Sequence, residues 1–463
     1  MIFRIFSAIA LALATSSLPA TESGPQEFRL DNGMKVIVKP DHRAPVVISQ
    51  VWYRIGSSYE EAGRTGLSHL LEHMMFKGTE KVGPGEYSRI VSELGGEENA
   101  FTGRDYTAYY ATVSAQHLDR SLELEADRMR NVVFDEKEFL KERAVVMEER
   151  RMRTDDKPVG LTYEQLMSVA WRASPYQNPV IGWMDDLKNM RKDALQRWYD
   201  MWYQPNNATL VVVGDVEPAQ VLAMARKHFG TIPAGEVPSP RQPVEPVQHG
   251  PTRVTVQVPA KQPYLIMGFK TPIVGTAEED WEPYALYVAS AILDGGASAR
   301  LATELVRGRK IAASAGAQYD PYSRLPDLFL FDGTPTDGHS VQEIEQALHE
   351  QILRLQQEPI SPDELERVVT QAVASKVYQR DSVFYQAMQI GMLDTLGLDW
   401  RLLDQEIERL RAVTPEQVQA VARKYLVENN LNVAVLIPKE KEADKVIAAP
   451  EDEGVVSEVM YAE

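Results

Sequence analysis

The sequence predicts an α+β fold made of two duplicated domains that a proline-rich linker joins. Three observations support this prediction: strand and helix patterns alternate along the chain, prolines cluster near its middle, and a segment of the first half recurs in the second. The length of 463 residues allows two to four domains at roughly 100–200 residues each. The predicted division is a signal peptide at 1–20, an N-terminal domain at 27–231, a linker at 232–252, a C-terminal domain at 253–438 and an acidic tail at 439–463.

Composition excludes several classes of protein. Hydrophobic residues make up 44% and charged residues 25%, which is typical of a globular protein and not of a disordered chain, a collagen or a polytopic membrane protein. The net charge of −18 repels nucleic acid and anionic lipid, so we expect neither nucleic acid nor membrane as a partner. Cysteine is absent, so any bound metal must rely on His, Asp or Glu, and the chain has only eight histidines.

The N-terminus has the pattern of a secretory signal peptide. Arg4 supplies a positive charge, Ile5–Ala14 is apolar apart from one serine, and small residues follow up to Ala20, where cleavage is expected. The alternatives are a membrane anchor or a buried strand, but ten apolar residues are too few to span a bilayer, which needs roughly 20. We therefore expect export across the inner membrane, to the periplasm.

The first half reads as strands interrupted by helices. β-Branched residues indicate the strands, and apolar residues at helical spacing indicate the helices. In chain order the expected elements are strands at Met34–Val38 and Val46–Ile55, a short helix at Thr65–Phe76, a strand at Thr107–Val113, long helices at Ser114–Arg130 and Lys137–Arg153, a buried strand at Leu210–Val213 and a helix at about Pro218–Phe229.

Six prolines between residues 232 and 252 mark a semi-rigid linker, and the strand pattern resumes at Arg253–Val258. The duplication is visible where each half ends. Tyr203–Val213 contains a Tyr, an Asn-Asn turn and an apolar strand, and Tyr425–Val435 repeats the same order. The final stretch, from residue 439, is acidic and weakly patterned, as expected of a flexible tail.

The most informative motif is His69-Leu-Leu-Glu72-His73. Residues four apart lie on one face of a helix, roughly 5–6 Å apart at Cβ, so two imidazoles at this spacing can share a metal ion. Glu72 lies near the same face and can serve as a general base for water. The order H-x-x-E-H is that of the inverted zincins. The alternative is a solvated helix surface, but the apolar neighbours of both histidines favour a buried helix with a metal as their partner.

A catalytic zinc site needs three protein ligands and an open position. With cysteine absent and no other histidine nearby, we expect a carboxylate as the third ligand. The helix at 139–153 offers Glu142, Glu148 and Glu149, of which Glu142 and Glu149 share a face. Spacing alone does not choose among them, and the helix could also be an ordinary charged surface helix.

Three segments resemble the pitrilysin family of inverted-motif zinc peptidases, which includes insulin-degrading enzyme and the mitochondrial processing peptidase. They are Val51–Glu60, Gly66–Thr79 and Asn99–Thr102, and the resemblance extends over nearly the whole chain after the signal peptide. It implies a fold in which each half is a mostly antiparallel sheet covered by helices, as in two-domain members similar to the catalytic subunit of the mitochondrial processing peptidase.

The resemblance also implies roles for individual residues. Glu149 takes the position of the third zinc ligand beside His69 and His73, so one Zn²⁺ per chain is expected. Glu142 takes the position of a group behind the ligands. Asn99 and Ala100 match the edge strand to which family members add a substrate peptide as an extra strand.

One departure from the family pattern concerns the second half. Active family members receive an Arg and a Tyr, seven residues apart, from a domain of this type. The matching segment places Val306 and Ala313 at these positions, with Arg307 one residue off. The segment Tyr284–Gly296, which matches the zinc helix, has no histidine. The resemblance therefore implies a homologous partner subunit that supplies the Arg/Tyr pair, as a heterodimer, with a homodimer less favoured.

Two functions follow from these observations. The first is a secreted zinc-dependent endopeptidase in which His69, His73 and Glu149 bind zinc, Glu72 is the catalytic base, and peptides are hydrolysed inside a chamber formed with the partner. The alternative is a non-catalytic peptide-binding or assembly subunit that retains the fold, suggested by the missing Arg/Tyr pair and opposed by the intact zinc motif.

Overall fold

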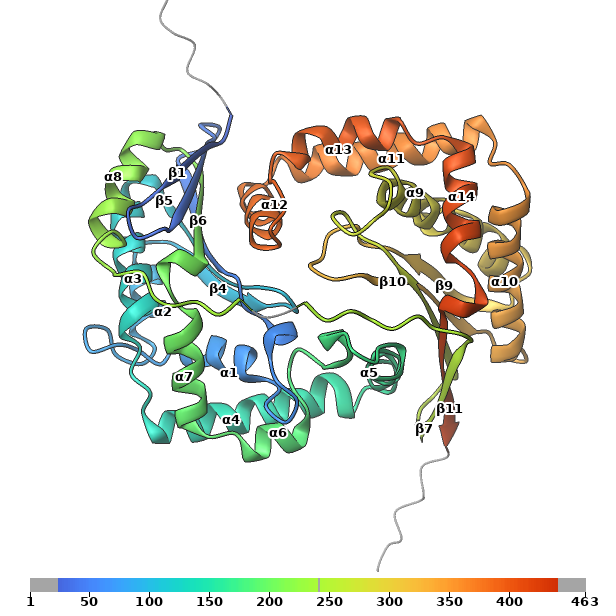
Figure 1. The fold of residues 1–463 in the computed structure, drawn as a ribbon, viewed down its shortest axis with the longest axis horizontal. Coiled ribbons are helices and arrows are strands. Elements are labelled where there is room, and N and C mark those ends of the chain that lie inside the picture. The colour runs from blue at the N-terminus through green and yellow to red at the C-terminus, as the bar shows by residue number, and fades with distance from the viewer. Residues whose placement is uncertain (1–23, 240–241, 440–463) are drawn as a thin grey trace, which may run out of the picture.

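The computed structural model describes residues 24–239 and 242–439, which form two sheets with helices packed around them (Figure 1). The predicted signal peptide lies outside the described residues, as does the predicted acidic tail apart from Lys439. Within the described ranges, no helix is both long enough and apolar enough to cross a bilayer.

The first sheet has six strands in the order β1-β2-β6-β3-β5-β4. Neighbouring strands are antiparallel except β2 and β6, which run parallel. Its strands are β1 (Gln26–Arg29), β2 (Lys35–Pro40), β3 (Val46–Tyr53), β4 (Glu97–Thr102), β5 (Thr107–Ser114) and β6 (Ala208–Gly214).

The helices of the first half are α1 (Leu67–Met74), α2 (Glu86–Glu93), α3 (Leu118–Asn131), α4 (Glu136–Arg150), α5 (Pro158–Ala170), α6 (Met184–Asn189), α7 (Lys192–Trp202) and α8 (Pro218–His228). Side chains alternate between the two faces of a strand. Val47 and Val51 of β3 accordingly join the core beneath α1, α3 and α7, whereas Ile48 and Trp52 face the opposite side.

The second sheet has five strands in the order β7-β11-β8-β10-β9, which repeats the first sheet without β1, and its parallel pair is β7 and β11. Its strands are β7 (Thr252–Pro259), β8 (Tyr264–Thr271), β9 (Ala312–Gln318), β10 (Asp327–Pro335) and β11 (Leu431–Lys439). The helices are α9 (Glu282–Asp294), α10 (Val341–Gln357), α11 (Pro362–Gln379), α12 (Val383–Thr395), α13 (Leu402–Arg411) and α14 (Pro415–Tyr425). The predicted α+β class with two duplicated, mostly antiparallel sheets is confirmed.

The repeated Asn-Asn segment has the same structural role in both halves. A short 3₁₀ turn precedes β6 at Pro205–Asn207 and precedes β11 at Glu428–Asn430. The Asn207 amide donates to the Trp202 carbonyl at 2.9 Å, and the Asn430 amide donates to the Tyr425 carbonyl at 3.0 Å. Each asparagine thus ties the end of a helix to the start of the central strand.

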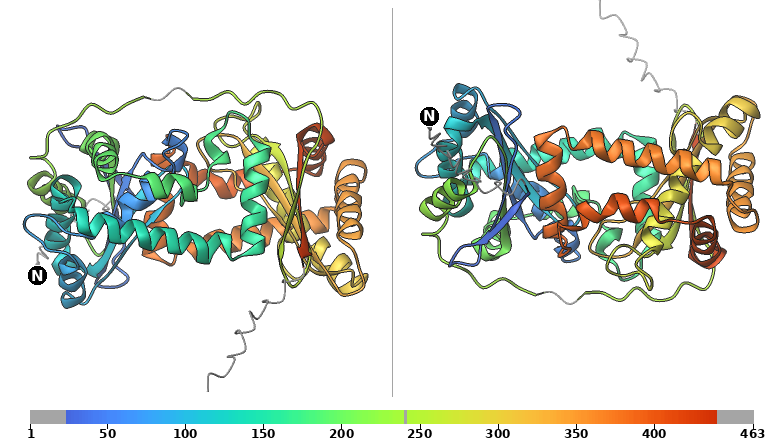
Figure 2. Two further views of the ribbon diagram at one scale, coloured as in Figure 1. Left: turned by 90° about the horizontal axis from the view of Figure 1, so that it is seen from below. Right: turned by 90° about the horizontal axis from the view of Figure 1, so that it is seen from above.

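Each half packs one of its helices against the sheet of the other half, an arrangement that we call the helix exchange. Helix α5 packs against β11, β7 and β8 of the second sheet, while α12 packs against β6 and β3 of the first (Figure 1). The described parts of the linker run along one side of the molecule (Figure 2). Helices α5 and α12 therefore contact the other half across the predicted boundary between the domains. The predicted domain bounds remain a prediction.

Three expected helices differ at their ends. The helix expected from Thr65 begins at Leu67, because Gly66 adopts a left-handed conformation with φ of 87°. The helix expected from Ser114 begins with a 3₁₀ turn, and α3 starts at Leu118. The helix expected to run to Arg153 is α-helical to Arg150 and continues as a π-helix over Arg151–Asp155.

Candidate metal centre

Helix α1 separates its apolar residues from its histidines. Leu67, Leu70, Leu71 and Met74 are buried in the core of the first half. His69, Glu72 and His73 lie toward the other side of the helix, with His69 and His73 one turn apart as the motif requires. The helix starts where the carboxylate of Glu60 accepts hydrogen bonds from the backbone N–H groups of Gly66 and Ser68, both at 2.7 Å.

Helix α4 packs against α1 and brings Glu149 to the two histidines. Glu149 Oε1 lies 3.8 Å from His69 Nε2, and Glu149 Oε2 lies 3.5 Å from His73 Nε2. One potential ligand atom of each residue lies within 4.8 Å of the other two. Glu148, which spacing left open as a ligand, is 60% exposed and pairs with Arg151 instead.

Glu142 lies behind His73 and away from the three ligand atoms. Its Oε2 is 3.2 Å from His73 Nδ1, and Lys77 donates to its Oε1 at 2.7 Å. Burial opposes ionisation of Glu142, but the hydrogen bonds from His73 and Lys77 outweigh burial and lower its pKa. Such a carboxylate fixes the ring orientation and leaves Nε2 of His73 free to point toward Glu149.

The surroundings of His69 suit a metal ligand. Burial, together with the nearby His73 and Arg153, lowers the pKa of His69 to about 3, so its imidazole is neutral at physiological pH. Neutral imidazole is the form that binds metals. His69 Nδ1 is buried and has no hydrogen-bond partner among the described residues. Two imidazole rings and a carboxylate facing one another fit the donor set of a catalytic zinc site.

Glu72 is held beside this cluster by a strand. Thr102, the last residue of β4, donates a hydrogen bond from Oγ1 to Glu72 Oε2 at 2.6 Å. Burial raises the pKa of Glu72, whereas the hydrogen bond from Thr102 acts in the opposite direction. A carboxylate with a raised pKa next to a metal site is suited to accept a proton from water.

Asn99 and Ala100 lie on β4, which is the last strand of the first sheet and pairs with β5 alone. Asn99 pairs with Tyr110 and Ala100 with Tyr109. The opposite edge of β4 carries no strand within the described chain, and β4 contacts α1. The structure therefore places both residues on an edge strand beside the histidine helix.

A pocket of about 460 Å³ adjoins the cluster. His69, Glu149 and Arg153 contribute to its lining, and Arg153 pairs with Glu149 Oε1 at 2.7 Å. Further lining residues come from β4, α5 and the segment before α6, and they include Thr102, Tyr163, Met167, Tyr176, Val180 and Ile181. A volume of this size accommodates one or two amino-acid side chains.

The second half carries no such cluster among the described residues. Val306 lies in a π-helix (Ala302–Gly308), and Ala313 lies in β9. The guanidinium of Arg307 donates to the carbonyl of Ala297. The side chains at these positions cannot supply the functions of the family's Arg and Tyr.

Comparison with known proteins agrees with this arrangement. A family model described as "Insulinase (Peptidase family M16)" matches residues 35–183, and one described as "Peptidase M16 inactive domain" matches residues 189–372. The zinc protease PqqE of Helicobacter pylori is 36% identical over 331 residues, which cover 70% of this chain and 72% of that protein. The chain belongs to peptidase family M16, the insulinase family. The resemblance inferred from the sequence motifs is thereby confirmed.

One further relative and two solved structures are also similar to this chain. An uncharacterised zinc protease of Mycobacterium tuberculosis is 30% identical and covers 91% of this chain and 94% of its own. The crystal structure of a protease from Helicobacter pylori has a TM-score of 0.85 at 29% identity and covers 90% of this chain and 100% of its own. The periplasmic protease PqqL of Escherichia coli shares the fold, with a TM-score of 0.75 at 19% identity, over 91% of this chain and 48% of its own.

Sequence reasoning gave no role to three residues that make polar contacts around the site: Glu60, Thr102 and Arg150. Each acts through a contact between segments that are distant in sequence or belong to different elements. The sequence carries a partial signal for Glu60 and Thr102, which close the segments Val51–Glu60 and Asn99–Thr102 that resemble the family.

Proposed function

We propose that this M16 chain is a zinc-dependent endopeptidase. The observation that carries the proposal is the convergence of His69, His73 and Glu149, with one ligand atom of each within 4.8 Å, beside a base on the same helix. Zinc bound there would supply Lewis-acid polarisation of the scissile carbonyl and of the attacking water. The zinc protease names of the relatives support zinc as the metal.

The chain's own residues supply the proton transfers and the positioning. Glu72 accepts a proton from water on its carboxylate and then donates it to the leaving amine nitrogen. Thr102 holds that carboxylate in place through its hydroxyl. Glu142 holds the ring of His73 from behind. The pocket beside Glu149 keeps a substrate side chain next to the reacting bond.

Peptide substrates would bind in extended form along β4. The free edge at Asn99 and Ala100 offers main-chain hydrogen bonds, which give affinity with little dependence on substrate sequence. Because Val306 and Ala313 replace the Arg/Tyr pair, we propose that a homologous partner subunit supplies that pair and completes a chamber. A heterodimer fits this better than a homodimer, since a second copy would lack the same pair.

The second candidate is a non-catalytic subunit that binds peptides or supports assembly. The absence of the Arg/Tyr pair at Val306 and Ala313 favours it. The complete histidine, base and carboxylate set in the first half favours the endopeptidase.

The deciding experiment compares wild type with Glu72→Gln, in the presence of any partner that co-purifies from the native source. Both proteins should contain one zinc per chain by elemental analysis. Hydrolysis of an unstructured peptide should fall at least about 100-fold in the variant, which is the usual contribution of a general base. Glu148→Gln, on the exposed face of α4, is the control and should keep full activity. Equal activity of wild type and Glu72→Gln would overturn the assignment, and a wild type that binds peptides without zinc would favour the second candidate.

Export to the periplasm is a further part of the proposal, and it depends on residues 1–20. Cell fractionation, with mass determination of the mature N-terminus, tests it. Cleavage after Ala20 is the expected result, and full-length protein in the cytoplasm would contradict export.

A further inference from the structure

Arg150, the residue directly after the proposed ligand Glu149, is buried and tightly paired. Its Nη1 donates to Glu164 Oε2 at 2.8 Å, and its Nη2 donates to Glu164 Oε1 at 2.9 Å. Nη1 also donates to the Gly182 carbonyl at 2.9 Å. The side chains of Arg150 and Glu164 are only 5% and 6% exposed. Two parallel bonds between a guanidinium and a carboxylate fix both groups in distance and in orientation.

These contacts join three segments around the end of α4. Arg150 is the last residue of α4, and the chain continues as the π-helix Arg151–Asp155. Glu164 lies on α5, and Gly182 lies in the segment before α6. A π-helical turn is rare and needs support from its surroundings. The pair between Arg150 and Glu164 spans this turn and thereby sets where α4 ends.

Gly182 connects the same network to the start of α1. Gly182 and Gly66 both have φ of 87°, and a Cβ on Gly182 would lie 2.7 Å from the Cα of Gly66. Gly66 precedes the first residue of α1, the helix of His69 and His73. The next residue along, Trp183, donates from its backbone N–H to Thr65 Oγ1 at 2.8 Å. Arg150 is therefore the end of the Glu149 helix, and its side chain contacts the segment packed on the start of the histidine helix.

We propose that Arg150, through its pair with Glu164, is a positioning residue that keeps the Glu149 carboxylate facing His69 and His73. The inference rests on the proposed metal centre, but it concerns geometry that exists before any metal binds. Glu149 sits one residue before Arg150, where the α-helix passes into the π-helix Arg151–Asp155 and the regular α-helical geometry changes. Small displacements of a ligand weaken a metal site strongly, so the support of this turn is part of the site.

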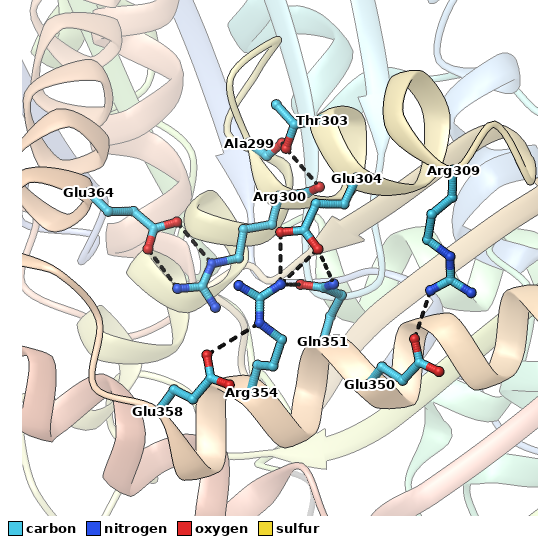
Figure 3. A network of polar contacts seen from close by, with 10 residues as sticks. All are labelled: Ala299, Arg300, Thr303, Glu304, Arg309, Glu350, Gln351, Arg354, Glu358 and Glu364. Carbon is cyan, nitrogen blue, oxygen red and sulfur yellow. Dashed lines mark hydrogen bonds and ion pairs between the residues drawn. The ribbon is translucent and has the colours of Figure 1, made fainter.

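The test compares Arg150→Lys with a matched change elsewhere. Lysine keeps the charge but loses the paired geometry. The control is Arg300→Lys in the second half, where Arg300 donates to both oxygens of Glu364 at 2.9 and 2.6 Å and the two side chains are 11% and 20% exposed (Figure 3). Zinc affinity of each full-length protein is measured by competition with a chromophoric chelator, alongside thermal unfolding without metal.

We expect Arg150→Lys to weaken zinc binding by about 10- to 100-fold, the range typical of groups that orient ligands. Arg300→Lys should bind zinc as wild type does, although both variants unfold at lower temperature. Equal zinc affinity of the two variants would overturn the proposal. If Arg150→Lys does not fold, Glu164→Asp shortens the acceptor by one methylene and takes its place.

Hydrogen exchange of the metal-free proteins separates this inference from the proposed function. In Arg150→Lys, faster exchange is expected at the end of α4 and at the start of α1, and not around β9. A wild type that binds no zinc would refute the metal centre, while the exchange pattern would still report on positioning. Unchanged exchange at both helix ends would contradict the role of Arg150 whatever the metal result.

Discussion

At the scale of single residues, the proposed base Glu72 is held by a strand distant in sequence. Glu72 lies on α1 and Thr102 ends β4, yet Thr102 Oγ1 donates to Glu72 Oε2 at 2.6 Å. The hydroxyl fixes one carboxylate oxygen and leaves the other available for water. Because β4 is also the strand proposed to bind substrate, one residue links the position of the peptide to the position of the base.

Replacing Thr102 by Val, which has nearly the same shape, removes only this hydrogen bond. A hydrogen bond to a charged group is worth about 1.5–3 kcal/mol, so we expect kcat to fall by about 10- to 100-fold. Zinc content should not change, because the Thr102 hydroxyl donates to Glu72 and not to a proposed ligand. Peptide hydrolysis measures kcat, and elemental analysis measures the zinc content. Thr102→Ser, which restores the hydroxyl, should recover most of the activity, and a Val variant with wild-type kcat would show that Glu72 needs no such support.

The sequence predicted part of this centre and could not predict the rest. The spacing of His69 and His73 predicted that both rings share one face of a helix with Glu72 nearby, since residues four positions apart on a helix lie on one face. Glu149 could not be separated from its neighbours by spacing and required the family resemblance. The hydrogen bond from Thr102 depends on how β4 lies against α1, a tertiary relation that no local pattern encodes.

At the scale of elements, α1 begins with an unusual cap. Its N-cap residue is Gly66, which has no side chain, and the carboxylate of Glu60 fills the role from six residues upstream. It accepts hydrogen bonds from the backbone N–H groups of Gly66 and Ser68, and these bonds oppose burial, which raises the pKa of Glu60 to about 8. The residue at which the histidine helix starts, and with it the position of His69 along the helix, therefore depends on a buried glutamate.

Changing Glu60 to Gln keeps the size of the side chain but presents an NH₂ group to one of the two N–H donors. One buried donor is left without an acceptor, so we expect a loss of about 1–3 kcal/mol in the free energy of unfolding. Denaturant unfolding measures the loss, with Glu61→Gln as the control. Glu61 is 77% exposed with only a weak pair to Arg64, and its change should cost less than about 0.5 kcal/mol. Equal stability of the two variants would mean that Glu60 does not cap α1.

Helix ends show the same limit on prediction from sequence. Apolar spacing located α1, α3 and α4, but each end is set by a feature beyond that spacing. Helix α1 begins later than predicted because Gly66 has a left-handed conformation, and α3 begins later because a 3₁₀ turn precedes it. Helix α4 continues as a π-helix at the point where Arg150 pairs with Glu164. Helical periodicity reports the buried face of an element and not its termini.

At the scale of the whole molecule, the exchange of α5 and α12 makes each half depend on the other. Hydrogen bonds to Asp394 of α12 stabilise the contact of this helix with the first half. Thr209 of β6 donates to the Asp394 carboxylate at 2.6 Å, and Arg54 donates to the Asp394 carbonyl at 3.0 Å. A second contact between the halves joins Arg324 Nε to Asp105 Oδ1 at 3.2 Å, and both side chains are largely buried. The halves repeat each other in strand order, but neither sheet is covered on both faces by its own helices.

Gly391 of α12 packs directly against Trp52 of β3, and Gly391→Ala tests this contact. A Cβ on Gly391 would lie 2.1 Å from Trp52 Nε1, and Trp52 is fully buried, with Phe101 and Tyr106 packed against its ring. The ring cannot move away without displacing β4, the strand that carries Phe101.

The sign of the effect is informative, because two contributions oppose each other. In an exposed helix interior, Gly→Ala stabilises by about 0.5–1 kcal/mol. Here the clash should outweigh that gain and destabilise by about 1–3 kcal/mol net, as overpacking does. Thermal unfolding gives the stability, and zinc affinity reports whether the disturbance of β4 reaches Glu72 and the ligands. Gly250→Ala, where a Cβ meets nothing within 4 Å, is the control and should leave both unchanged. A Gly391→Ala variant more stable than wild type would show that α12 does not dock on Trp52 in solution, and that the halves are not joined as the exchange requires.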